Sequence, residues 1–135
     1  MKINHEKDGI PMTLQDIITY SERIIKHASR RLAVEEQLPA SERTYHGGYS
    51  IGLYKGRIDG YTFARDALAR GTFGAIDEEI ARLDALRDAV LSENSAGQDT
   101  ITLTGAQGEA LAHHKMTYEA LDDIRELIVE SGVNA

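Results

Sequence analysis

The chain contains no cysteine, and this absence excludes several classes of protein. Without thiols there is no disulfide framework, no cysteine nucleophile and no cysteine zinc site. No run of apolar residues approaches the ~18 that a helix needs to span a bilayer. Segment 1–12 lacks the apolar stretch of a signal peptide. We therefore expect a cytoplasmic protein with no membrane partner.

Positive charge is scarce, and the charges are unevenly distributed. The net charge is −7. Segment 47–75 is the only net basic part of the chain, whereas 76–99 and 100–135 are both acidic and 1–46 is neutral. An acidic field disfavours contact with nucleic-acid phosphates. We therefore expect no direct binding to nucleic acid.

Length and hydrophobic patterning predict a single all-α domain over residues 1–135. A chain of this length can bury a core as one domain, and its hydrophobic fraction of 41% is ordinary for a globular protein. Apolar residues recur at helical spacing in four segments, which predicts a four-helix domain. Residues 1–12 are expected to form an N-terminal arm and 94–103 a loop. The arm and the loop each allow a short extended segment, and the one in the loop would cover 99–103.

Turn and capping residues predict where the first two helices begin and end. Thr13 and Asp16 have the spacing of a capping box at the start of the first helix. That helix should end near Gln37, because a proline follows closely. The second helix should begin between Ser41 and Tyr49. It should end at Gly71.

The last two helices carry similar signals. Asp77 is the predicted N-cap of the third helix, because aspartate side chains accept hydrogen bonds from the first free amides. Thr104 and Gln107 form a second capping-box pattern at the start of the fourth helix. Gly132 is expected to end it.

The most unusual feature is a small residue at every fourth position of the second predicted helix. Residues four apart lie one above the other on a helix, so this stretch would carry a ridge almost without side chains. Four helical glycines cost ~4 kcal/mol of propensity relative to alanine. Another helix, a second copy of the chain or a ligand must approach closely enough to offset that cost. The predicted ridge consists of Gly48, Gly52, Gly56, Gly60 and Ala64.

Aromatic and cationic side chains accompany this ridge. Tyrosine rings can stack on a flat ligand, and lysine and arginine bind anions. These side chains point in several directions around a helix, so they could converge on one ligand only with help from a partner chain. The alternative is that the tyrosines are half-buried and the cations solvated. The candidate ligand-binding or partner-binding residues are Tyr49, Tyr54, Lys55, Arg57, Tyr61 and Arg65.

The sequence offers no catalytic residue and no complete metal site. No familiar nucleophile motif is present. Glu109 and His113 could share a metal from adjacent turns, but two ligands make a poor site. His114 falls on an apolar stripe, where a histidine with its hydrogen bonds satisfied is the more common occurrence. We therefore expect a non-enzymatic protein without cofactor or metal.

The pattern Gly-Tyr-x-x-Gly-x-x-x-Gly-Arg-Ile-Asp at Gly48–Asp59 resembles small accessory proteins of phages and mobile elements. The resemblance implies a stoichiometric binder or inhibitor. Our main hypothesis is a homo-oligomeric interaction protein that also binds an unidentified protein. It would use the glycine-rich helix 47–68 for close packing and recognition.

Two other functions remain open at this stage. One is the sequestration of a small anionic ligand such as a nucleotide, which aromatic rings beside cations would favour. The other is mimicry of nucleic acid by an acidic surface that inhibits a DNA- or RNA-binding protein. The residues proposed for the ligand are Tyr54, Lys55, Arg57 and Arg65. Those proposed for the mimic are Asp122, Asp123 and Glu126.

Overall fold

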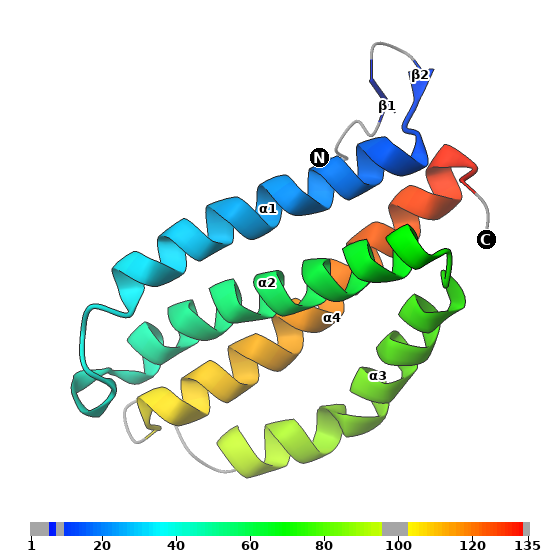
Figure 1. Cartoon of the computed structure of the whole chain (residues 1–135). Helices are drawn as coiled ribbons and strands as arrows, with labels where there is room; N and C mark the ends of the chain where they lie inside the picture. Colours follow the sequence, from blue (N-terminus) through cyan, green and yellow to red (C-terminus); the bar gives the residue numbers. More distant parts are fainter. Residues whose placement is uncertain (1–5, 8–9, 96–102, 134–135) are drawn as a thin grey trace.

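Four helices pack into one domain in the computed structural model, which describes residues 6–7, 10–95 and 103–133 (Figure 1). This confirms the predicted all-α fold. No helix in the described part of the chain is long and apolar enough to cross a membrane. The helices are α1 (Leu14–Glu35), α2 (Tyr45–Arg70), α3 (Gly74–Ser95) and α4 (Gly105–Ser131), with a single 3-10 turn at Ala40–Glu42.

The N-terminal arm contains a short hairpin. Strand β1 (Glu6–Lys7) pairs antiparallel with β2 (Ile10–Pro11), so the arm has the extended segment that the sequence allows. The second predicted extended segment, 99–103, lies mostly outside the described residues. The part of it that is described, Leu103, is buried.

Capping boxes begin α1 and α4 as predicted. The Asp16 amide donates to Thr13 Oγ1 at 3.1 Å, and the Thr13 amide donates to Asp16 Oδ2 at 3.0 Å. Thr104 and Gln107 exchange the same pair of bonds, at 3.2 and 2.8 Å. Each box satisfies two amides that have no partner within the helix, so these boundaries are encoded locally.

The two predicted C-terminal glycines are confirmed, whereas the predicted start of α3 is wrong. Gly71 and Gly132 follow the last turns of α2 and α4 with φ of 74° and 67°, the left-handed conformation that glycine adopts without strain. Helix α3 begins at Gly74, three residues before Asp77. The chain enters a helical turn directly after Gly71, because the Ala75 amide already donates to the Thr72 carbonyl at 3.0 Å. Asp77 therefore lies in the first turn, where it still favours the helix dipole.

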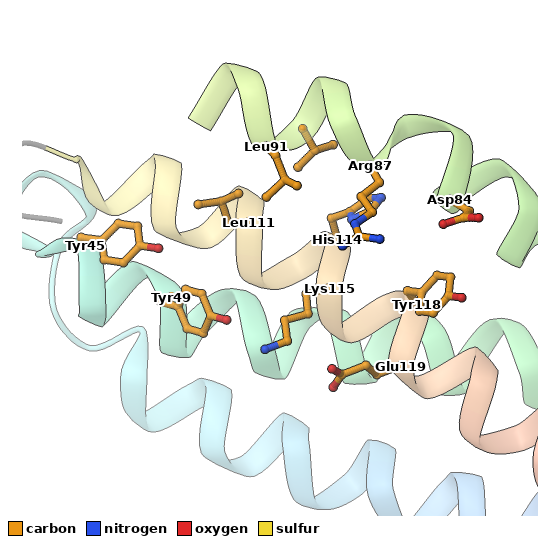
Figure 2. A pocket seen from close by; sticks show the side chains of 11 residues that line it. Tyr45, Tyr49, Asp84, Arg87, Leu91, Leu111, His114, Lys115, Tyr118 and Glu119 are labelled. Atoms are coloured by element: carbon orange, nitrogen blue, oxygen red, sulfur yellow. The ribbon is translucent and has the colours of Figure 1, made fainter. Parts of the chain in front are cut away.

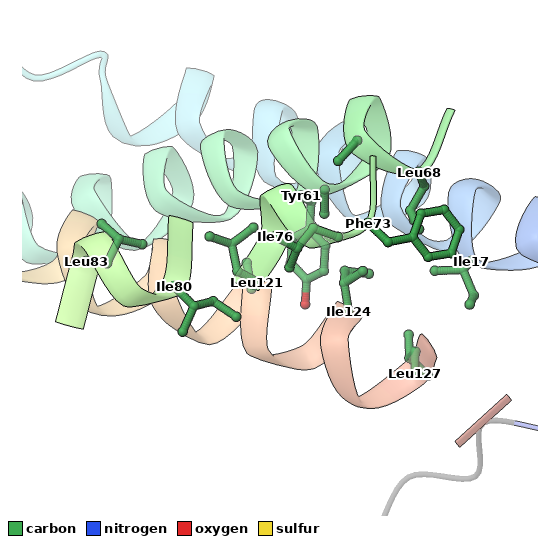
Figure 3. Close-up of a cluster of buried hydrophobic side chains, with 13 residues drawn as sticks. Ile17, Tyr61, Leu68, Phe73, Ile76, Ile80, Leu83, Leu121, Ile124 and Leu127 are labelled. Atoms are coloured by element: carbon green, nitrogen blue, oxygen red, sulfur yellow. The ribbon is translucent and has the colours of Figure 1, made fainter. Parts of the chain in front are cut away.

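The hydrophobic core lies between α1, α2, α4 and the first half of α3 (Figure 3). Helix α3 contributes side chains at helical spacing as far as Leu83 and no buried residue from Asp84 to Asn94. Figure 1 shows α3 as a curved helix along the outer edge of the molecule. The labelled core residues are Ile17, Tyr61, Leu68, Phe73, Ile76, Ile80, Leu83, Leu121, Ile124 and Leu127.

Candidate functional site

The glycine ridge of α2 lies directly on α4. A Cβ added at Gly56 would lie 2.8 Å from the His113 carbonyl oxygen, and one at Gly60 would lie 2.6 Å from Ala120 Cβ. Real Cβ atoms essentially never approach so closely, so the two helices can be this near only because the side chains are missing. All the predicted ridge residues are buried: Gly48, Gly52, Gly56, Gly60 and Ala64.

Helix α4 meets the ridge with small residues of its own. A Cβ at Gly108 would collide with the Tyr45 carbonyl, and Gly105 lies against Gly48. The contacts advance in the same direction along both helices, so α2 and α4 run parallel. Of the three occupants considered for the ridge, the structure places another helix of the same chain there. The ridge is therefore covered within the chain and is not open to a second copy or a ligand.

The candidate binding residues of α2 lie on different sides of that helix. Lys55 donates to Glu109 Oε2 of α4 at 3.1 Å. Arg65 bonds to its neighbour Asp66 at 3.2 Å. Tyr49 lies toward α3. Lys55 and Arg65, two of the proposed ligand-binding cations, are thus held in ion pairs, and neither lines the cavity that Tyr49 lines.

Tyr54 and Arg57 face α1. The Arg57 guanidinium carbon lies 5.7 Å from the centre of the Tyr54 ring. Arg31 of α1 approaches the same ring at 6.0 Å. This pair of α2 residues therefore stays together, and α1 adds a cation that the sequence pattern did not indicate.

Tyr61 belongs to a hydrogen-bonded cluster in the core. Its hydroxyl donates to Asp123 Oδ2 at 2.6 Å, and the hydroxyl of Tyr20 donates to the same oxygen at 2.7 Å. Burial, and then these bonds to a carboxylate, raise the pKa of both tyrosines well above the usual range. The cluster links α1, α2 and α4. Tyr61 is therefore a structural residue with no hydroxyl to offer a ligand.

The acidic residues proposed for nucleic-acid mimicry are partly neutralised. Asp123 accepts the two tyrosine hydroxyls, and Asp122 forms an ion pair with Arg125. Only Glu126 of the three is fully exposed. The ion pair offsets the charge of Asp122, and the two hydroxyl bonds tie Asp123 to the core, so the three carboxylates do not form one free acidic surface.

A groove of about 600 Å³ opens between the second half of α3 and the N-terminal halves of α2 and α4 (Figure 2). We call it the α3–α4 groove. Tyr49 is the one predicted binding residue that lines it. Its lining residues are Tyr45 and Tyr49 from α2, Asp84, Arg87, Val90 and Leu91 from α3, and Leu111, His114, Lys115, Tyr118 and Glu119 from α4.

One hydrogen bond joins α3 to α4 at the α3–α4 groove. His114 Nε2 lies 2.7 Å from the Leu83 carbonyl oxygen, and because a carbonyl only accepts, this nitrogen carries the proton. Leu83 is also the last buried residue of α3. The expectation that His114 is a satisfied histidine on an apolar stripe is confirmed.

The chemistry of the α3–α4 groove suits a protein surface better than a single ion. Its walls combine leucine and tyrosine side chains with both signs of charge. Tyrosines are enriched where one protein binds another, because the ring buries area while the hydroxyl remains hydrated. Leu91 lines the groove and is 44% exposed, although apolar residues of an amphipathic helix usually face the core. This mismatch is the signal of the groove, and it becomes visible only when the fold is known.

The histidines form no metal cluster in the described part of the chain. His113 Nε2 lies 2.6 Å from Asp59 Oδ2, and Glu109 instead pairs with Lys55. Across residues 6–7, 10–95 and 103–133, no three acidic or histidine side chains gather as metal ligands would. Glu109 and His113, considered together as metal ligands, therefore pair with different residues, Lys55 and Asp59 respectively.

Comparison with known proteins identifies no relative of this chain. No protein family, curated protein or solved structure matches the chain. The functional argument for this four-helix domain therefore depends on its own contacts, exposed surfaces and charges.

Proposed function

We propose that this protein is a non-enzymatic interaction module that associates with a second copy of itself through the α3–α4 groove. The observation that carries the proposal is the second half of α3. From Asp84 to Asn94 no side chain is buried, although a helix of this length is marginal in water unless one face packs against something. Leu91, which lines the groove and is 44% exposed, is the apolar residue of α3 that a partner would cover.

The charges along the groove favour a second copy as the partner. An interface with twofold symmetry must be complementary to itself, because the same patch faces its own image. Both walls meet this condition, since Asp84 and Arg87 lie on α3 while Lys115 and Glu119 lie on α4. A surface of one sign would repel its own copy.

The resemblance to accessory proteins supports a stoichiometric binder, but the glycines that carry it have a packing role. Gly48, Gly52 and Gly56 contact α4 in the chain itself. An unidentified protein that the dimer binds would therefore recognise some surface other than the ridge. We keep this inhibitory role as part of the proposal.

Size-exclusion chromatography with light scattering tests self-association. We expect the wild type to elute with twice the 14.9 kDa mass of one chain. Leu91→Glu should shift the mass toward one chain, because it would bury a charge in the interface. The control is Val34→Glu, which places the same charge on an exposed position of α1 outside the groove.

Two outcomes would refute the proposal. One is a wild-type mass of a single chain at every concentration. The other is a dimer that Leu91→Glu and Val34→Glu weaken equally. Circular dichroism of both variants would show that each retains its helices.

A further inference from the structure

A second concave surface lies between α1 and α2. Figure 1 shows α1 on the other side of α2 from α3. This cavity has a volume of about 390 Å³, within the range of sites for small molecules. We call it the α1–α2 cleft. Its lining residues are Tyr20, Arg23, Ile24, His27, Arg57 and Tyr61.

Cations from two helices converge on the α1–α2 cleft. Arg23, His27 and Arg31 occupy successive turns of α1 on one face, because they are four residues apart. Arg57 projects from α2, and its guanidinium and that of Arg31 meet at the ring of Tyr54. A tyrosine ring offsets only part of the repulsion between two guanidinium groups.

This positive charge is not neutralised by the surrounding residues. Arg31 has one carboxylate nearby, Glu35, at 3.9 Å and on the surface. Neither Arg23 nor Arg57 forms an ion pair with any residue that the structure describes. Arg23 and Arg57 therefore lack an ion-pair partner among the described residues, and a bound anion would reduce the repulsion between them.

The floor of the cleft offers aromatic surface rather than hydroxyl groups. The hydroxyls of Tyr20 and Tyr61 are both directed to Asp123, and the two rings meet edge to face with centres 6.1 Å apart. These bonds hold the rings rigidly. A ligand would therefore gain ring contact here and charge-assisted hydrogen bonds from the arginines at the rim.

We propose that the α1–α2 cleft binds a nucleoside phosphate. Arg23 and Arg57, which line the cleft from α1 and α2, would bind its phosphate groups, because a guanidinium matches phosphate oxygens with two parallel hydrogen bonds. The base would lie against Tyr20, the partly exposed ring of the cleft floor. This site is independent of self-association through the α3–α4 groove.

Isothermal titration calorimetry of the full chain tests this site with ATP, GTP, CTP and UTP, and with adenosine and inorganic phosphate as partial ligands. We expect at least one triphosphate to bind one per chain, more tightly than either partial ligand. Arg57→Gln should weaken that binding at least about tenfold, because it removes a charge-assisted contact. Arg30→Gln, which removes the same charge from the adjacent position on α1, should leave it unchanged.

Three results would overturn the proposal. They are the absence of binding by all four triphosphates, equal affinity for inorganic phosphate, and equal effects of Arg57→Gln and Arg30→Gln. The variant Leu91→Glu should bind the triphosphate as the wild type does. Failure of self-association and failure of nucleotide binding are therefore separate outcomes.

Discussion

Asp123 illustrates how a single residue can stabilise three helices. Its Oδ2 atom accepts the hydroxyls of Tyr20 from α1 and Tyr61 from α2, while its own backbone belongs to α4. Tyr61 is only 7% exposed, so its hydroxyl has no access to bulk water if the carboxylate is lost. A buried hydroxyl without a partner costs about 1–3 kcal/mol. This network therefore positions the helices as well as stabilising them.

The raised pKa of Tyr61 gives a prediction for alkaline solution. Burial, and then the hydrogen bond to Asp123, keep this tyrosine protonated in the folded state at a pH where the unfolded chain loses the proton. Its stabilising effect is complete below the unfolded pKa of 10.0 and decreases as pH rises above it. The free energy of unfolding should fall by about 1.4 kcal/mol per pH unit from this group.

Urea denaturation of the wild type and Tyr61→Phe below and above pH 10 would measure that slope. The variant should be less stable near neutral pH by about 1 kcal/mol, because one hydrogen bond is lost. Above pH 10 its stability should decline less steeply than that of the wild type. Parallel curves for the two proteins would contradict the assigned origin of the pKa shift.

At the scale of helices, the contact between α2 and α4 determines the architecture. Gly48 and Gly47 are adjacent on α2, but only Gly48 faces the backbone of α4. Gly48→Ala should lower the free energy of unfolding by about 1–3 kcal/mol, because the added methyl group would overlap Gly105. Gly47→Ala meets Thr44 Oγ1 at an ordinary 3.5 Å, so it should be neutral or stabilise by up to about 1 kcal/mol.

Thermal or urea unfolding of the two variants makes this comparison directly. Both substitutions add the same methyl group and the same helix propensity. The difference between them therefore isolates the close approach of α4. Equal stabilities would mean that the ridge is not tightly packed in solution.

The sequence could predict the helices and most of their ends, because those features are local. The capping box at Thr13 needs nothing beyond three residues, and the glycine at Gly132 needs only its own backbone freedom. The start of α3 was misplaced because Asp77 is a good cap in isolation, while the turn after α2 begins the helix earlier.

The occupant of the ridge and the composition of the sites could not be predicted from the sequence. Four-residue spacing shows that a surface must approach, but not whether it belongs to the same chain. Similarly, periodicity places Leu91 on an apolar stripe without showing what covers it. Arg23 and Arg57 approach the same cleft only because α1 and α2 pack side by side, and no local spacing encodes that pairing.

At the scale of the whole molecule, the topology explains why half of α3 is exposed. Helices α2 and α4 run parallel, so the chain must return along the molecule between them, and α3 makes this crossing. Its first half completes the core and ends at the bond between Leu83 and His114. In the part of the chain that the structure describes, its second half buries no side chain from Asp84 to Asn94. The same helix therefore serves as a connection and as a surface for a partner.

This division predicts two levels of protection against hydrogen exchange within one helix. In a dilute sample the amides of Asp84–Asn94 should exchange quickly, because few buried contacts oppose local opening, while those of Ile76–Leu83 should exchange slowly. Raising the protein concentration should slow exchange in Asp84–Asn94 alone, since self-association stabilises the covered segment by mass action. Exchange measured by mass spectrometry at two concentrations would test this. Protection of Asp84–Asn94 that does not change with concentration would mean that α3 is stable without a second copy.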